Sequence, residues 1–113
     1  MSGELTEALS KREQIERDEL NRAFREVFTS AAGKRVLFWL LEQTAIYEEA
    51  FTGDDNATNY RLGLQSGGRR LIGKLDQIDP RLYPRLLLDI ADLKAMDQAA
   101  AEKAAQQELP EDE

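Results

Sequence analysis

The apolar residues in the first region of the chain are spaced as in a helix, and they become more frequent towards its end. Its apolar residues recur at steps of four, three and one, and they are Leu20, Phe24, Val27 and Phe28. This spacing predicts a helix over residues 5–28 with one buried face. Upstream of that face the stretch SKREQIERDELNR is polar almost all round, and pairs such as Glu13 and Arg17 support a solvated helix. We therefore expect residues 1–19 to project from the fold.

The densest apolar run, VLFWLL, predicts a central second helix. Ser30 is suited to cap a helix over residues 31–47. The stripe that we expect to be buried comprises Val36, Leu37, Leu40 and Leu41. Phe38 and Trp39 widen this stripe, and a helix that is apolar on most sides lies in the middle of a bundle. Trp39 is accordingly predicted to pack against neighbouring helices.

Two further helices follow a polar loop, FTGDDNATNY, at residues 51–60. Asn56 or Thr58 is expected to cap a third helix that runs to about Ile78. The Asp-Pro pair at residues 79–80 ends this helix and opens a fourth, because proline suits a first helical turn. The apolar faces of the two helices comprise Leu64, Leu71, Ile72, Leu75 and Ile78, and then Leu82, Leu86, Ile90 and Leu93.

The apolar pattern fades towards the end of the chain. DQAAAEKAAQQ favours helix through its alanines but offers little to bury, and ELPEDE is expected to be a disordered acidic end. No alternating strand pattern occurs, so the sequence predicts an all-α fold, a small bundle of about four helices. We expect a polar helical extension over residues 1–19, a helical core domain over 20–95, and an Ala-rich acidic tail over 96–113.

Charge is distributed unevenly along the chain. The net charge is −7, yet residues 61–85 hold six basic residues against two acids, and residues 86–113 hold eight acids against two lysines. An acidic chain is poorly suited to bind nucleic acid directly, because such binding depends on phosphate neutralisation. The basic segment is suited to an acidic protein partner. The residues predicted to bind this partner are Arg61, Arg69, Arg70, Lys74, Arg81 and Arg85.

The chain contains no cysteine and no histidine. It therefore has neither thiolate ligands nor the usual general base, and we expect no cofactor, no metal site and no enzymatic activity. GDDN resembles a calcium loop only in part, because its acids are adjacent and no closing glutamate follows. The apolar run is too short to span a membrane, and the N-terminus lacks the order of a signal peptide, so we expect a location in the cytoplasm.

The stretch RLGLQSGGRRLIGK raises the alternative of a phosphate-binding loop. Gly68 to Lys74 has the required spacing, but Leu75 stands where the motif needs Ser or Thr, and no strand precedes it. Gly63 and Gly67 lie one helical turn apart. We expect them to allow a neighbouring helix to approach closely, which offsets their low helix propensity.

The order GKRVL, FTG, a tyrosine and GGRRL resembles a family of small tailed-bacteriophage proteins encoded among the head and portal genes. The resemblance covers residues 24–86, about half of the chain. Its matching positions are Gly33, Arg35, Phe51, Thr52, Gly53, Tyr60, Gly63, Gly67 and Arg70. It implies a virion-associated or head-assembly role and supplies no catalytic residues.

Two functions are compatible with these features. The first is a non-enzymatic phage structural or assembly protein that contacts portal, capsid or internal proteins and forms homo-oligomers, with copies packing head to tail. It would act in the host cytoplasm during assembly and enter the virion. The alternative is an acidic inhibitor of a host nucleic-acid-processing enzyme, in which residues 86–113 imitate phosphates. An enzyme is the weakest of the possibilities.

Overall fold

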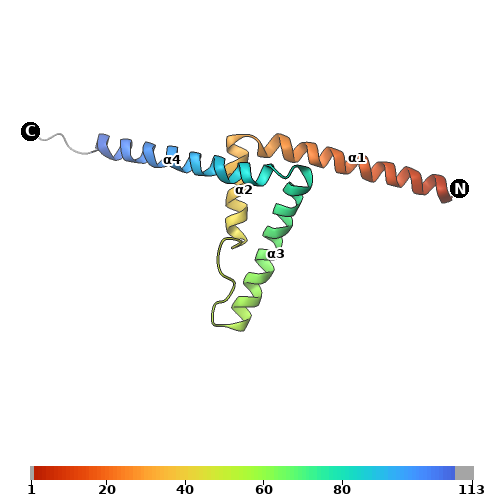
Figure 1. The fold of residues 1–113 in the computed structure, drawn as a ribbon, viewed down its shortest axis with the longest axis horizontal. Coiled ribbons are helices and arrows are strands. Elements are labelled where there is room, and N and C mark those ends of the chain that lie inside the picture. Colours follow the sequence, from red (N-terminus) through yellow and green to blue (C-terminus); the bar gives the residue numbers. More distant parts are fainter. Residues whose placement is uncertain (1, 109–113) are drawn as a thin grey trace, which may run out of the picture.

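A computed structural model of the chain describes residues 2–108, and this part consists of four helices and no strands. The helices are α1 (Ser2–Phe28), α2 (Ala31–Gln43), α3 (Asp55–Ile78) and α4 (Leu82–Glu108) (Figure 1). The predicted all-α class with four helices is confirmed. The expected disordered end spans residues 108–113, of which Glu108 is the last residue of α4 and residues 109–113 lie outside the described residues.

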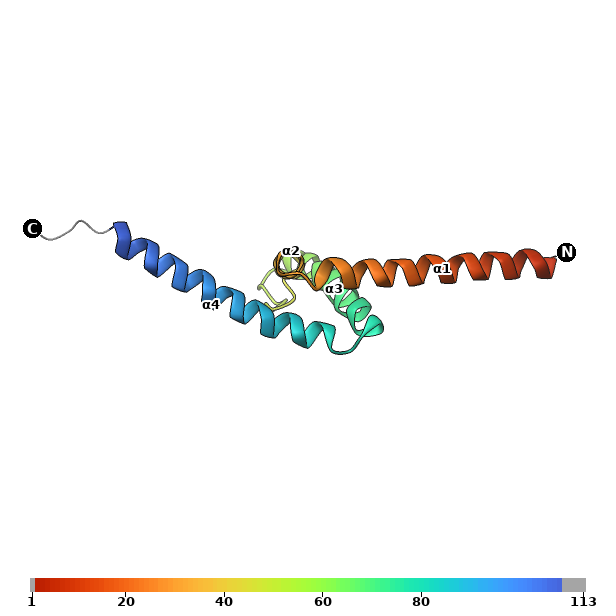
Figure 2. The same cartoon turned by 90° about the horizontal axis from the view of Figure 1, so that it is seen from above.

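The four helices form an open, T-shaped molecule. Helices α1 and α4 leave a common junction in opposite directions, and the α2–α3 hairpin projects sideways from it (Figures 1 and 2). The molecule measures 88 × 40 × 19 Å and has a radius of gyration of 21.1 Å. A compact domain of this length has a radius of gyration of about 13 Å. Much of the chain therefore lies far from the core.

The core lies at the junction and contains five buried apolar residues. They are Leu37, Leu41, Leu75, Leu86 and Ile90, with Phe24, Phe28, Phe38 and Leu71 among the partly buried residues around them. Helix α2 contacts each of the other three helices, as expected of the central helix. Each helix contributes only one short apolar face because the helices cross at the junction instead of running side by side.

The prediction that α2 is buried on most sides is wrong. Val36 is 55% exposed, Trp39 57% and Leu40 40%, whereas Leu37 and Leu41 on the opposite face are fully buried. Trp39 therefore does not pack into the core as predicted. It borders α4 across a shallow hollow that Ile90 and Leu93 also line, and more than half of its side chain stays exposed.

Hydrogen bonds between neighbouring residues determine where the helices begin and end. Ser30 caps α2 as predicted, because its Oγ accepts a hydrogen bond from the Gly33 N–H at 3.0 Å. Helix α2 ends at Gln43, earlier than expected, and Ala45 takes a left-handed conformation with φ 56°. Helix α3 begins after Asp54, whose carboxylate accepts from the Ala57 N–H, so neither Asn56 nor Thr58 is the cap.

The buried side chain of Gln65 holds the turn after α2 in place. Its amide nitrogen donates to the carbonyls of Ala45 at 2.9 Å and Glu48 at 2.8 Å. These bonds satisfy backbone acceptors of the turn that follows α2. They also tie the start of the loop to the middle of α3, which closes the α2–α3 hairpin.

The two arms of the molecule are solvated helices. Residues 3–20 of α1 are all exposed, and burial begins at Asn21. In α4 the last partly buried residue is Leu93. Both helices continue without a break through residues 19–20 and 95–96, where the sequence predicted divisions, so the arms are direct continuations of the core helices.

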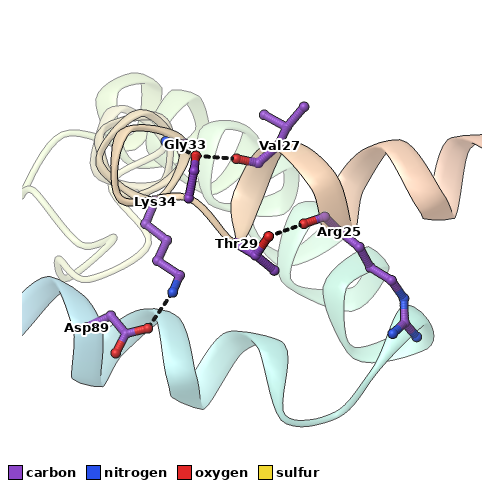
Figure 3. A network of polar contacts seen from close by, with 7 residues as sticks. Arg25, Val27, Thr29, Gly33, Lys34 and Asp89 are labelled. Carbon is purple, nitrogen blue, oxygen red and sulfur yellow. Dashed lines mark hydrogen bonds and ion pairs between the residues drawn. The ribbon is translucent and has the colours of Figure 1, made fainter.

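Ion pairs join α2 to α4 across the junction. Lys34 Nζ lies 2.5 Å from Asp89 Oδ2, and these side chains are only 18% and 28% exposed (Figure 3). Arg35 binds both carboxylate oxygens of Asp97, at 2.7 and 2.9 Å, in a more exposed position. The hydrogen bonds from Arg35 hold the pKa of Asp97 below its ordinary value, because they stabilise the carboxylate. The Lys94 ammonium adds a third contact, 4.5 Å from the centre of the Phe38 ring.

The close helix contact predicted at Gly63 and Gly67 is wrong, because a Cβ atom at either position would meet nothing within 4 Å. Gly68 is the glycine that α3 needs. A Cβ there would overlap the Thr44 hydroxyl and lie 3.2 Å from the Cβ of Ile46. The Thr44 hydroxyl donates to the Leu41 carbonyl at 2.5 Å and cannot move without losing that bond. Gly33 is required in the same way, because a Cβ there would overlap the Val27 carbonyl.

Alanine substitutions at two adjacent glycines are expected to have opposite effects. Gly67→Ala faces open space and should raise the free energy of unfolding by about 0.5–1 kcal/mol through helix propensity. Gly68→Ala should lower it by about 1–3 kcal/mol because the new methyl group is forced against Thr44. Urea unfolding followed by circular dichroism measures both changes, and equal effects of the two substitutions would contradict the packing described for α3.

The two α2–α4 ion pairs are expected to differ in importance. Lys34→Met leaves Asp89 without its partner in a largely buried position and should lower the free energy of unfolding by about 1–3 kcal/mol. Arg35→Met, one position later, is the matched control and should change it little, because that pair is exposed and screened. Urea unfolding again provides the measurement. A loss for Arg35→Met that equals the loss for Lys34→Met would overturn this ranking.

Candidate functional site

A groove lies where the α1–α2 turn faces the α3–α4 turn, and we call it the junction groove. Its volume is about 570 Å³. Its cationic lining residues are Lys34, Arg81 and Arg85, and its apolar lining includes Leu82, Pro84 and Leu88. Asp79 is the acid in the lining. The groove therefore combines an apolar surface with an excess of positive charge.

The α1–α2 turn forms one wall of the junction groove. Thr29 Oγ1 donates to the Arg25 carbonyl at 2.6 Å and Ser30 Oγ donates to the Val27 carbonyl at 3.0 Å, so both hydroxyls satisfy the last carbonyls of α1. Arg25 also donates to the Ile78 carbonyl at 3.0 Å. This bond ties the end of α1 to the end of α3, and Figure 3 shows Arg25 beside the turn that leads into α4.

The α3–α4 turn forms the opposite wall. Asp79 lies in an extended conformation after α3, and its Oδ1 accepts from the Arg81 N–H at 3.0 Å and from Arg81 Nε at 3.2 Å. The hydrogen bonds from Arg81 lower the pKa of Asp79, which keeps the carboxylate ionised. The Arg81 side chain is 90% exposed, so its guanidinium stays accessible from solvent.

Arg81 is the residue before α4 and Arg85 lies in the first turn of that helix, where the Arg85 N–H donates to the Arg81 carbonyl at 3.0 Å, and both side chains line the junction groove. Arg85 is exposed and makes no ion pair within residues 2–108. Leu88 is 62% exposed and continues the groove by one turn. The groove thus presents two exposed guanidinium groups beside an exposed apolar side chain.

The other four predicted partner-binding residues lie on α3, outside the junction groove. Arg61 donates to the Glu49 carbonyl at 2.9 Å, so it stabilises the loop of the hairpin. Arg69 and Arg70 are exposed, and Lys74 is half-buried. Consecutive residues on a helix point about 100° apart, so Arg69 and Arg70 do not share one face. The structure therefore brings Arg81 and Arg85 together at the junction groove, whereas the four cations of α3 lie outside it.

Three aromatic side chains of the hairpin are exposed. Phe51 is 77% exposed and Tyr60 71%, both close to its loop, and Trp39 is exposed on α2. A shallow hollow of about 230 Å³ beside Trp39 also involves Lys94 and Asp97. The sequence placed Trp39 in the core, so its exposure was not predicted.

Chemical groups for catalysis are sparse in the described part of the chain. Residues 2–108 contain no group of three acidic side chains placed to hold a metal ion. The glycines and Lys74 that resembled a phosphate-binding loop lie inside the uninterrupted helix α3, where the backbone N–H groups are used by the helix. Over the same residues no helix has the length and apolar character of a membrane span.

One tyrosine pair stands out at the end of the hairpin. The hydroxyl groups of Tyr47 and Tyr83 lie 2.8 Å apart, and the Tyr47 ring stacks on Phe38 with ring centres 5.7 Å apart. Partial burial and the hydrogen bond to Tyr83 raise the pKa of Tyr47. Tyr47 therefore stays neutral, and the hydrogen bond joins the turn after α2 to the start of α4.

Comparison with known proteins gives one family. The sequence model of the Bbp19-like phage proteins matches residues 24–88. The comparisons with curated proteins and with solved structures found no match. The matched segment includes both turns that form the junction groove, and it ends at Leu88, the groove residue furthest along α4. Because the match covers more than half of the chain, this protein belongs to the Bbp19-like phage protein family.

Proposed function

We propose that this phage protein is a non-enzymatic structural or head-assembly protein that acts through protein–protein contacts. Its partners would be copies of itself and other phage structural proteins, such as portal, capsid or internal proteins. The proposal places it in the host cytoplasm during assembly and in the particle afterwards. One observation carries the proposal, the large surface that the folded chain leaves uncovered.

The accessible surface of the chain is 8999 Å², for a mass of 12.8 kDa. A compact monomer of this mass exposes about 6,300 Å². The surplus is about 2,700 Å² per chain, whereas a standard protein–protein interface covers about 800 Å² on each partner. The surplus is therefore large enough for several interfaces, and it favours a protein that is completed by its partners.

The uncovered surface includes many apolar side chains on the arms. On α1, Leu5 is 64% exposed, Leu9 49%, Ile15 63% and Leu20 50%. On α4, Met96 is 66% exposed. Exposed apolar residues along a helix favour contact with another helix, since burying them releases ordered water. Membership of a phage family and the resemblance to proteins encoded among head and portal genes support phage structural proteins as the partners.

Purified phage particles test this proposal. We expect peptides of this protein in mass spectra of particles or of assembly intermediates purified by density gradient. A phage that lacks the coding sequence should yield fewer infectious particles, and expression of the protein from a plasmid should restore the yield. As a control, lysate that contains the protein but no particles is taken through the same gradient, which shows whether free protein reaches the particle fractions. If the protein is absent from particles and intermediates and its loss leaves the yield unchanged, the proposal is wrong.

The alternative function, inhibition of a host nucleic-acid-processing enzyme, depends on exposed acids along α4. Asp92 and Glu102 are exposed and are available for such a role. Asp89 and Asp97 are engaged by Lys34 and Arg35, which reduces the negative surface that α4 presents. A pull-down from host lysate distinguishes the two functions. One stoichiometric host enzyme, lost when residues 96–113 are deleted, would favour the inhibitor.

A further inference from the structure

We infer that the junction groove binds residues 109–113 of a second copy of this chain, so that copies join head to tail. The segment Leu-Pro-Glu-Asp-Glu at these positions is named here the acidic segment. The inference rests on the proposed function, because it names the surface by which an assembly protein joins its own copies. It adds a defined partner, a defined polarity and a prediction about oligomer geometry.

The chemistry of the groove matches the acidic segment in kind. The apolar lining of Leu82, Pro84 and Leu88 suits an apolar pair, which Leu109 and Pro110 provide. The guanidinium groups at the rim suit carboxylates, and residues 111–113 are all acidic. Arginine is the residue best suited to bind carboxylates, because its planar group donates two parallel hydrogen bonds.

The guanidinium groups are available for this contact. Arg85 is exposed and makes no ion pair in the part of the chain that the structure describes. Arg81 pairs with Asp79, but its side chain is 90% exposed. The Asp79 side chain is only 19% exposed and keeps its bonds from Arg81, but a guanidinium has five N–H donors, so Arg81 can bind a carboxylate of a second copy without releasing Asp79. Lys34 also lines the groove, but its charge is paired with Asp89, so the free positive charge of the groove comes from the arginines.

The acidic segment cannot reach the groove of its own chain. Leu88 is the lining residue nearest to it in sequence, and Leu88 and Glu108 are 20 residues apart in one continuous helix. Twenty helical residues span about 30 Å. The five residues of the acidic segment span at most about 18 Å when fully extended. Because the helix keeps the two apart, the contact can form only between copies.

This geometry determines the type of assembly. Each copy offers one groove at the start of α4 and one acidic segment beyond its end, and Figure 1 shows that α4 points away from the junction. The two surfaces differ, so the interface is heterologous and each new copy leaves one groove and one segment free. Such contacts produce a ring when the rotation closes and a filament when it does not. A symmetric dimer would instead use the same surface on both copies, and assembly would end at two copies.

The test measures self-association of purified protein by size-exclusion chromatography with light scattering. We expect the mean mass of the full chain to rise with concentration beyond two copies and to fall at high salt, because salt screens the arginine–carboxylate contacts. Deleting residues 109–113 should give a monomer, and so should Arg81→Glu with Arg85→Glu. Arg69→Glu with Arg70→Glu is the matched control, since it changes the charge equally outside the groove and should still associate.

Mixing two defective proteins tests the polarity directly. The deletion variant keeps its groove and lacks the segment, whereas the groove variant keeps the segment and lacks a working groove. Each alone should be a monomer, and an equimolar mixture should form a species of two chains and no larger one. A mixture that stays monomeric, or that restores the large assembly, would overturn the head-to-tail arrangement.

A binding measurement distinguishes loss of the groove contact from misfolding of the groove variant. A fluorescent peptide of residues 106–113 should bind to the deletion variant. Adding Arg81→Glu and Arg85→Glu to that variant should weaken the affinity about tenfold, because each substitution replaces an attraction with a repulsion of similar size. Arg85→Glu alone, which removes no ion pair within the described residues, should weaken it in the same direction, and Arg70→Glu should not. Equal binding to groove and control variants would contradict the inference.

The outcomes separate this inference from the proposed function. If the groove and deletion variants associate like the full chain, the docking of the acidic segment is wrong, while the presence of the protein in particles still supports the assembly role. If association depends on the groove and the segment but the protein is absent from particles and intermediates, the docking stands and the assembly role falls.

Discussion

The packing of α2 against α4 at the junction is the interaction on which the rest of the molecule depends. Leu37 and Leu41 from α2 and Leu86 and Ile90 from α4 make up most of the buried cluster, and α3 adds Leu75. The Lys34–Asp89 pair holds the same two helices together beside this cluster. Because so few side chains are fully buried, each contributes a large share of the stability, and the directions of both arms are set by this one crossing.

The small core explains the shape and the surface of the protein. Helices that cross at one point cannot cover each other along their length, so most of α1 and the second half of α4 remain in solvent (Figures 1 and 2). Long isolated helices are only marginally stable in water, and packing of an apolar face normally stabilises them. The exposed Leu5, Leu9 and Leu20 on α1 are therefore more consistent with a subunit of a larger assembly than with a protein that acts alone.

The charge asymmetry of the chain has two roles in the structure. Some basic and acidic residues pair within the molecule and hold α2 on α4, as Lys34 and Asp89 do. Others lie towards the two ends of α4, with exposed arginines in the junction groove at its start and acids at residues 111–113, which follow it in the sequence. The length of α4 keeps these opposite charges apart within one chain. A long rigid helix can in this way favour contacts between molecules over contacts within one.

The sequence by itself determined the helices. The helical spacing of Leu20, Phe24 and Phe28 predicted α1, and the cap at Ser30 and the end of α3 at Ile78 were predicted as well. These features could be predicted because hydrogen bonding at helix ends and the helical period depend on residues a few positions apart. The polar character of residues 3–20 likewise indicated an arm before any packing was known.

Only the tertiary structure decided which faces meet. Trp39 and Leu37 are equally apolar by sequence, yet the crossing of the helices buries one and exposes the other. Gly67 and Gly68 are indistinguishable along the chain, and the position of Thr44 makes Gly68 the one that must stay small. The junction groove joins residues from two separate turns, and the pairing of Lys34 with Asp89 spans 55 positions. Such contacts depend on interhelical angles, which a single sequence does not encode in any local pattern.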